Sequence, residues 1–344
     1  MYLCENFLRM KKHFPLIVKI SLIAVYLIFL AGSVVRMTGS GMGCPDWPKC
    51  FGEYVPPTSE AQLPDNYQDF FRTQRLKKTE RFVSLLKLVG LEGQANKIEA
   101  TSEDNYTHDF NVTKAYVEYI NRLWGAVTGI IVFLCFLLSF KYLRSNRRVF
   151  IYTTLGFIAV FLNALLGAVV VNSNLIGGIV TAHFIAAFAS ICFFILARHY
   201  VSPFDQGSLN KQSKILALLL MVVISIQVIL GAELREVFDM ISGTLSFGEK
   251  SNNLYPTFQI HGVVGLLTFT LVIFQSIKLI KSSLTSKYAL YIAILSASQL
   301  LFGPLALVDT FASISKLFHI SIGAGIFVLQ FYICTTLIRV KNKT

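Results

Sequence analysis

Long apolar stretches alternate with short polar ones along most of the chain. Eight of the apolar stretches reach about 20 residues, the length that an α-helix needs to cross a lipid bilayer. These stretches are Leu16–Val35, Val117–Phe140, Phe150–Val171, Ile176–Ala197, Ile215–Leu234, Thr257–Ile280, Lys287–Val308 and Leu317–Ile338. Only one intervening segment, Arg36 to Ala115, is long. The pattern therefore predicts an all-α, polytopic membrane protein with eight transmembrane helices.

Composition and charge agree with this prediction. Hydrophobic residues make up 54% of the chain and its mean hydropathy is +0.60, which excludes an ordinary soluble domain. The net charge of +12 would suit a nucleic-acid-binding protein, but the basic residues gather at the two termini and in every second loop. By the positive-inside rule, this distribution predicts cytoplasmic termini and no nucleic-acid partner. The first apolar stretch has no small-residue cleavage site, so we do not expect it to be a cleaved signal peptide. The N-terminus is also not rich enough in Arg and Ser for an organelle transit peptide, so we expect a multi-pass protein of the bacterial inner (cytoplasmic) membrane.

The second half of the chain repeats residues of the first half at constant spacing. The equivalent sets are Gly32 and Arg36 with Gly231 and Arg235; Asn121 and Gly125 with His261 and Gly265; and Asn163, Gly167 and His183 with Gln299, Gly303 and His319. Such self-similarity predicts two repeated four-helix bundles, each with an interior site. We expect the first to comprise residues 1–149, with helices 1 and 2 and the large outer loop 36–115, and residues 150–213, with helices 3 and 4. The second is expected to span residues 214–344.

Three histidines hold equivalent places in this repeat. His183, His261 and His319 each fall within the first two turns of a helix that enters from the outer side, so they lie at similar depth. Histidines that face each other across a helix bundle are the usual ligands of a membrane haem. A lone buried histidine is usually a satisfied polar group, but three in register favour haem ligation. The pair His261 and His319 predicts a haem iron with two axial imidazoles.

The first half differs from the second in its charged residues. Glu118 lies three residues before Asn121, on the same helix face, and Arg122 follows directly. An ionisable residue in a membrane helix is costly and marks a functional site by default. We therefore expect chemistry on a bound substrate in the first half and electron transfer in the second. The alternative is that Glu118 only forms an ion pair with Arg122 or Arg36.

Two arginines end their helices at the outer face, where the propionates of a haem would emerge. Arg36 and Arg235 suit bidentate pairing with carboxylates. The alternative is plain snorkelling of both side chains to the membrane interface.

The long outer loop contains two cysteines and two further segments. Cys44 and Cys50 lie on the oxidising side and five residues separate them, so we expect a disulfide, with two free thiols as the alternative. Asp69 to Leu91 is typical of an amphipathic helix that lies on the membrane face or caps the first-half site. Gln94 to Asn111 is polar, and we expect it to be flexible. His108 is expected to be exposed there, with the alternative that it reaches the first-half site.

Two motifs resemble those of bacterial heme A synthases. They are Thr38-Gly-Ser-Gly-Met-Gly-Cys-Pro-Asp-Trp-Pro-Lys-Cys-Phe-Gly52 and Glu118-Tyr-Ile-Asn-Arg-Leu-Trp-Gly125, and the resemblance extends to the histidines and across all eight helices. It implies a membrane haem-dependent oxidoreductase that converts the C8 methyl of heme O to the formyl group of heme A, the cofactor of terminal oxidases. It also implies heme O as substrate in the first bundle, haem b in the second, and a disulfide near the substrate site. Glu118 would then stabilise the positive charge that develops at the reacting methyl.

Asn121 departs from the family pattern, which has histidine at this position. Asparagine is a weak iron ligand, so we expect the first-half haem to be five-coordinate through His183 or to be ligated by another group such as His108. An open iron position is compatible with oxygen activation. The change is equally compatible with a paralogue that binds haem without converting it.

The sequence thus favours a heme A synthase over two rivals. One rival is a di-haem membrane cytochrome that passes electrons without converting haem, and the other is a small-molecule transporter built from repeats. The expected partners are membrane lipid, a heme O synthase and assembly factors of the terminal oxidase.

Overall fold

A computed structural model describes residues 2–46, 48–88, 90–102, 109–172, 179–202, 211–241, 247–280, 286–308 and 310–336. Within these ranges the chain forms ten α-helices and no strand, apart from an isolated bridge between Cys50 and Glu53. The α-helices are α1 (Tyr2–Met37), α2 (Tyr67–Leu88), α3 (Glu92–Ser102), α4 (Val112–Ser139), α5 (Arg147–Asn172), α6 (Ile179–Val201), α7 (Lys211–Ile241), α8 (Phe247–Ile280), α9 (Ser286–Leu305) and α10 (Ala312–Thr336). Two short 3-10 helices cover Glu60–Gln62 and Phe140–Tyr142.

Eight of these helices are long and apolar enough to cross a membrane, which confirms the predicted polytopic all-α class. Several extend beyond the apolar stretch that predicts them, because polar turns continue the helix on one or both sides. For example, α1 begins at Tyr2 although its apolar stretch begins at Leu16.

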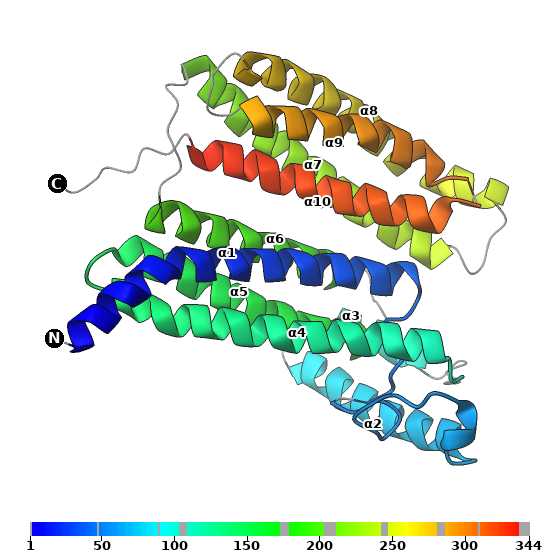
Figure 1. Ribbon diagram of the computed structural model, residues 1–344. Helices are drawn as coiled ribbons and strands as arrows, with labels where there is room; N and C mark the ends of the chain where they lie inside the picture. Colours follow the sequence, from blue (N-terminus) through cyan, green and yellow to red (C-terminus); the bar gives the residue numbers. More distant parts are fainter. Residues whose placement is uncertain are drawn as a thin grey trace.

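The eight candidate membrane helices pack as two groups of four, which lie side by side in Figure 1. In the first group the order of packing around the bundle is α1, α4, α5, α6, and in the second it is α7, α8, α9, α10. Consequently α4 and α6 lie diagonally opposite each other, as do α8 and α10. The two groups meet where α6 and α1 pack on α10 and α6 packs on α7. We call the end at which α1 ends and α4 begins the loop end.

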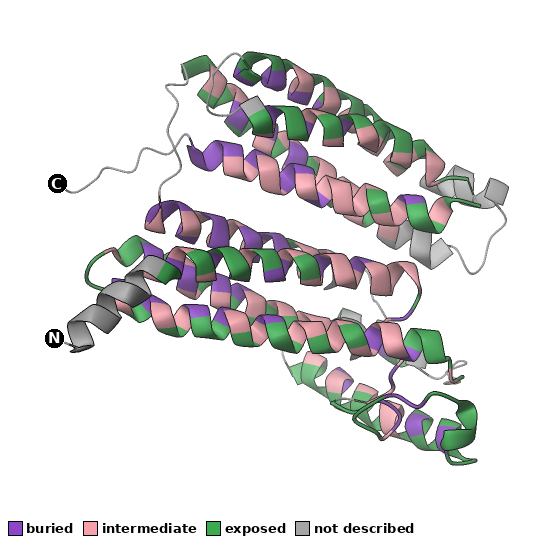
Figure 2. Cartoon of the chain, viewed as in Figure 1, coloured by how far each residue is buried: buried purple, intermediate pink, exposed green. Residues whose placement is uncertain are grey.

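Apolar side chains cover much of the outer surface of both groups, where Figure 2 shows many exposed residues. Ile130, Val263 and Leu301 are 61%, 70% and 59% exposed. Such an apolar surface is stable only against lipid, because in water it would be an aggregation liability. Inside the groups, small residues let helices approach closely: a methyl group added at Gly156 of α5 would lie 2.9 Å from the Phe194 ring of α6.

Aromatic rings fill the contact between the two groups. Phe188 of α6 lies 5.2 Å from Phe29 of α1 and 4.5 Å from Phe327 of α10, between ring centres. These rings belong to a core cluster that extends into the second group. The interface is therefore apolar and well packed, which holds α6 and α10 at a fixed separation.

The segment between α1 and α4 corrects one expectation. The sequence suggested a flexible segment from Gln94 onward, but α3 is a helix as far as Ser102. It is held against α2 because Ala95 and Ile98 bury their side chains with Val83. A helix is present where the sequence predicts one, as α2, which buries Tyr67, Phe71 and Val83, but its apolar residues do not form a pronounced amphipathic face. His108 lies outside the described residues.

A buried amide pair ties α8 to α10 in the half of the bundle away from the loop end. Gln275 and Gln330 are 1% and 0% exposed and exchange hydrogen bonds of 2.8 and 3.1 Å. Gln330 also donates to the Ala217 carbonyl of α7 at 2.9 Å. Since lipid offers no alternative partner, this network fixes three helices of the second group.

We expect Gln330→Leu to destabilise the protein by about 1–3 kcal/mol, because it leaves the Gln275 amide buried without a partner. The measurement is the thermal unfolding midpoint of the protein in detergent. Gln275→Leu combined with Gln330→Leu should recover part of the loss. A double variant less stable than Gln330→Leu alone would contradict the assigned pairing.

Candidate functional site

Two imidazoles face each other at the loop end of the second bundle. The rings of His261 on α8 and His319 on α10 have centres 6.1 Å apart, across the diagonal of the bundle. A metal–imidazole bond is about 2 Å, and the ring centre lies about 1 Å further, so two axial imidazoles on one metal lie about 6 Å apart. The observed separation therefore fits a shared metal between the rings.

Each of these rings lies against a glycine of the preceding helix. A methyl group added at Gly231 of α7 would lie 3.0 Å from Cε1 of His261, and one added at Gly303 of α9 would lie 3.4 Å from Cε1 of His319. Any larger residue would push the rings out of place. The glycines therefore provide the space that sets each ring's position.

Side-chain amides fix the backbone at both histidines. Gln227 donates to the His261 carbonyl at 3.0 Å, and Gln299 donates to the His319 carbonyl at 2.7 Å. The Gln227 amide nitrogen also lies 3.4 Å from Nε2 of His261. The Nδ1 atoms of both histidines are buried and have no hydrogen-bond partner among the described residues.

This arrangement fits a haem. The macrocycle fills the equatorial positions of its iron, so two imidazoles complete the coordination. Each imidazole has two nitrogens, so that one can bind iron while the other remains available for a hydrogen bond that orients the ring. The buried nitrogens without partners are those that an iron or an orienting group would satisfy.

Among its described residues, the first bundle holds one comparable imidazole. His183 of α6 lies against Gly167 of α5, where an added methyl group would be 3.3 Å from its Cε1, and faces the backbone carbonyl of Asn163. Asn121 of α4 lies on the diagonally opposite helix, and its Oδ1 is buried without a partner among the described residues. The first bundle therefore offers an imidazole from one helix and an amide from the other.

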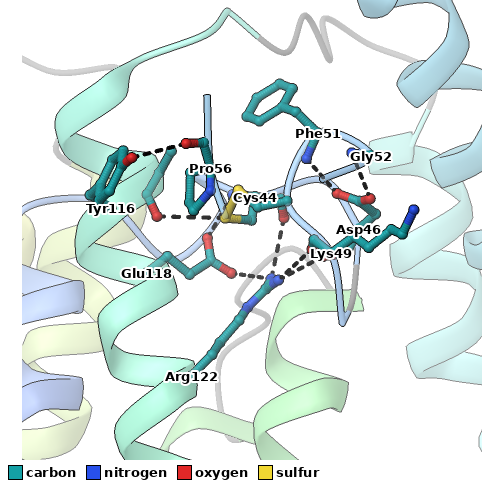
Figure 3. The surroundings of a disulfide bond; sticks show 11 residues. Cys44, Asp46, Lys49, Phe51, Gly52, Pro56, Tyr116, Glu118 and Arg122 are labelled. Atoms are coloured by element: carbon teal, nitrogen blue, oxygen red, sulfur yellow. Dashed lines mark hydrogen bonds and ion pairs between the residues drawn. A yellow bond between two sulfur atoms is a disulfide. The ribbon is translucent and has the colours of Figure 1, made fainter. Parts of the chain in front are cut away.

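Glu118 lies beneath the disulfide loop, close to the loop end of α4 (Figure 3). It is only 3% exposed, and both carboxylate oxygens are engaged. Its Oε2 accepts the backbone N–H of Cys44 at 2.9 Å, and its Oε1 pairs with the Arg122 guanidinium one turn further along α4. The ion pair with Arg122, one of the readings that the sequence allows, is thus present.

Arg122 binds the disulfide loop through its other hydrogen bonds (Figure 3). It donates to the carbonyls of Cys44 at 3.2 Å, Asp46 at 2.6 Å and Lys49 at 3.5 Å. A disulfide joins Cys44 to Cys50, as expected, with a Cα–Cα distance of 4.8 Å. One guanidinium therefore connects the buried carboxylate to most of the turn that the disulfide closes.

The loop sequence explains its shape. Asp46 accepts the N–H groups of Phe51 at 2.7 Å and Gly52 at 3.0 Å, both of which have positive φ. Gly43 passes so close to α4 that a methyl group there would lie 2.4 Å from the Lys114 carbonyl oxygen. Only glycine permits this approach, which brings Cys44 within reach of Glu118.

An aromatic cluster attaches α2 to this loop. The Phe51 ring meets Phe71 of α2 and Phe110 edge-on, with ring centres 5.5 and 5.1 Å apart. Tyr67, also on α2, accepts a hydrogen bond from the Phe110 N–H at 3.3 Å. Since Cys44 and Cys50 belong to the same buried cluster, α2 stabilises the closed turn.

Arg36 and Arg235 are half-buried near the loop end. Arg36 lies one turn beyond Gly32 on α1, and Arg235 lies one turn beyond Gly231 on α7, so each shares a helix face with its glycine. Their role toward propionates stays a prediction.

Sequence reasoning missed two contributors. The comparison of the two halves did not single out Gln227, because the equivalent position of the first half holds the apolar Ile28. Gln227 nevertheless precedes Gly231 by four residues, just as Gln299 precedes Gly303. That spacing is the signal that would have identified it. Asp46 was noted only as part of a motif, and its role depends on backbone geometry that the sequence does not display.

Most of the chain matches a known protein family. The family model COX15-CtaA, described as "Cytochrome oxidase assembly protein", matches residues 16–85 and 91–331. Over 180 residues the chain is 23% identical to a protein of Shewanella oneidensis named "Heme A synthase". That alignment covers 52% of this chain and 43% of the relative, so the chain spans less than half of the relative's length in the match.

We expect Arg122→Ala to destabilise the loop end by about 3 kcal/mol or more, because it leaves the buried Glu118 carboxylate without its cation. The disulfide should also be reduced by an added thiol about tenfold faster or more, since the turn loses three backbone contacts. Timed alkylation and mass analysis measure this rate. Arg144→Ala, an exposed arginine beyond the opposite end of α4, is the matched control. Equal reduction rates in both variants would refute the role of Arg122.

Proposed function

The chain belongs to the COX15-CtaA family of cytochrome oxidase assembly proteins, and on this premise we propose that it is a heme A synthase. It would oxidise the C8 methyl of heme O to a formyl group for the terminal oxidase. The name of the Shewanella oneidensis relative supports this assignment. We place the protein in a bacterial inner membrane with both termini in the cytoplasm, where a heme O synthase supplies the substrate and oxidase assembly factors receive the product.

In this proposal the second bundle binds haem b through His261 and His319. The 6.1 Å separation of the rings supports it, as do the glycines against which both rings lie. Gln227 and Gln299 hold the two histidine backbones, so that the rings need little rearrangement on binding. A bis-imidazole haem in an apolar bundle suits electron transfer.

The first bundle binds heme O through His183. Bound haem supplies the redox centre, while the protein orients the substrate and sets the charge around it. Conversion of methyl to formyl replaces two carbon–hydrogen bonds by one carbon–oxygen double bond. With the oxygen atom taken from water, four protons and four electrons leave, and dioxygen or another external oxidant accepts the electrons.

Glu118 is the residue to which we assign the chemical role. Arg122 and the Cys44 N–H hold its carboxylate in place, and a carboxylate can accept further hydrogen bonds beyond these two. A fixed negative charge at the loop end stabilises positive charge that develops at the methyl carbon. Arg36 and Arg235 are assigned to the propionates of the two haems.

The observation that carries the proposal is the difference between the two bundles. Glu118 and Arg122 lie beneath a disulfide-closed turn in the first bundle, whereas the equivalent positions of the second hold Phe258 and Gly262. A protein that only relays electrons between two equivalent haems needs no such cap over one of them.

We expect co-expression with a heme O synthase, in a host without heme A, to yield heme A or its hydroxylated precursor on haem extraction and mass analysis. Heme O as the sole haem product would refute the enzymatic assignment. Purified protein without Soret absorption would refute haem binding altogether and favour a transporter.

Glu118→Gln should lower heme A formation by at least about tenfold. The haem content and the thermal unfolding midpoint of the variant should stay close to those of the parent protein. Glu233→Gln, which changes an exposed carboxyl on α7, is the matched control and should leave the yield unchanged. The second candidate function, a di-haem electron carrier, is favoured by the full engagement of the Glu118 oxygens. Absence of heme A from the parent, together with an unchanged haem spectrum and electron flux in Glu118→Gln, would support that candidate.

A further inference from the structure

The three histidines at the loop end are held by one recurring arrangement. On one helix an amide residue precedes a glycine by four residues, and the imidazole of the next helix lies against that glycine. We call this arrangement the clasp. Its three instances are Gln227 and Gly231 with His261; Gln299 and Gly303 with His319; and Asn163 and Gly167 with His183.

The clasp is reciprocal in the second bundle. One turn after each histidine stands a second glycine, and the amide of the partner helix lies against it. A methyl group added at Gly265 would lie 2.9 Å from Nε2 of Gln227, and one added at Gly323 would lie 3.2 Å from Nε2 of Gln299. In each pair, the glutamine of one helix and the histidine of the other therefore each lie against a glycine of the opposite helix.

The pair α1 and α4 carries the fourth clasp with both polar partners replaced. Ile28 stands where Gln227 stands in the second bundle, and Asn121 stands in place of His261. The geometry is retained, because a methyl group at Gly125 would lie 3.9 Å from Cδ1 of Ile28. Gly32, however, has no atom within 4 Å of the place where its methyl group would be. The space that an imidazole ring fills in the other clasps is therefore open beside Gly32.

The two replacements have one consequence. Ile28 cannot hold the backbone of α4 through a hydrogen bond, and Asn121 leaves its buried Oδ1 without a partner among the described residues. Asparagine is also shorter than histidine and a poor ligand for iron. The face of the first-bundle site opposite His183 therefore presents a small amide and free volume instead of an imidazole.

The other histidines of the described chain cannot take this place. His199 lies 16 residues beyond His183 on α6, or about 24 Å along the helix. His13 precedes Gly32 by 19 residues on α1, or about 28 Å. Both belong to the opposite end of the bundle.

We propose that the first-bundle haem has His183 as its single axial protein ligand, and that the Asn121 side of this haem is a binding site for a neutral diatomic ligand of the dioxygen class. The Nδ2–H group of the Asn121 amide would donate a hydrogen bond to that ligand, a type of contact that controls ligand binding at haem iron. This inference rests on the proposed function, since it presupposes that the first bundle binds haem. The second-bundle haem, with two imidazoles, has no such open position.

Carbon monoxide titration of the reduced, haem-loaded protein tests this site, together with the spin state of the oxidised protein. We expect carbon monoxide to bind half of the haem, and the same half to be high-spin. Fully loaded protein that is entirely low-spin and binds no carbon monoxide would overturn the inference while leaving the proposed function intact. Protein that binds no haem would instead overturn the proposed function.

Exchange of the clasp residues gives a reciprocal test. Ile28→Gln with Asn121→His should rebuild the fourth clasp, make both haems low-spin and weaken carbon monoxide binding by at least about tenfold. Gln227→Ile with His261→Asn should give the second bundle the open form, so that carbon monoxide binds all of the haem. Since the two double variants change opposite bundles, misfolding of one leaves the other decisive. Unchanged carbon monoxide binding in a folded, haem-loaded double variant would overturn the inference.

His108→Ala tests whether His108 is a second ligand of the first-bundle haem, because His108 lies outside the described residues. We expect this variant to bind carbon monoxide in the same proportion as the parent. Gain of carbon monoxide binding on removal of His108 would identify that residue as the ligand and overturn the proposal.

Discussion

A polar ring nitrogen inside an apolar helix bundle needs a partner, because lipid supplies none. This constraint governs the loop end of both helix groups. The clasps fix the imidazoles of His183, His261 and His319 against glycines, and amides of neighbouring helices secure the backbone beside two of them. The Nδ1 atoms of these rings are nevertheless buried without a hydrogen-bond partner in the part of the chain that the structure describes. In the proposed function, haem iron would satisfy one nitrogen of each ring, so the helix packing and the cofactor would depend on each other.

The two bundles share one type of helix packing but differ in the side chains at the loop end. In the second, two matched clasps bring imidazoles from diagonal helices to 6.1 Å, and the Gln275–Gln330 pair ties the same two helices further along the bundle. In the first, Asn121 on α4 faces the site instead of an imidazole, while Glu118 and Arg122 connect α4 to the disulfide turn. A symmetric, doubly tied site suits electron relay, whereas an open and capped site suits chemistry on a substrate.

Hydrophobic pattern was sufficient to predict the eight membrane helices, because membrane thickness imposes a length that the sequence displays directly. The disulfide between Cys44 and Cys50 was expected from spacing and compartment, and it is present. The helical part of α3 was missed because only Ala95 and Ile98 face a partner, which is too few apolar positions for a clear period. The site was predicted as residues in register, but their support was not: Gln227 acts through a contact between helices that a single sequence cannot reveal. The internal repeat and the ligand roles of the histidines stay predictions.

A structure of the purified, haem-loaded protein, determined by electron microscopy, would test the central claim most directly. We expect one flat macrocycle between the imidazoles of His261 and His319, with both rings bound to its iron, and a second against His183 with Asn121 on its other side. Clear density for α8 and α10 with no macrocycle between the two imidazoles would contradict it.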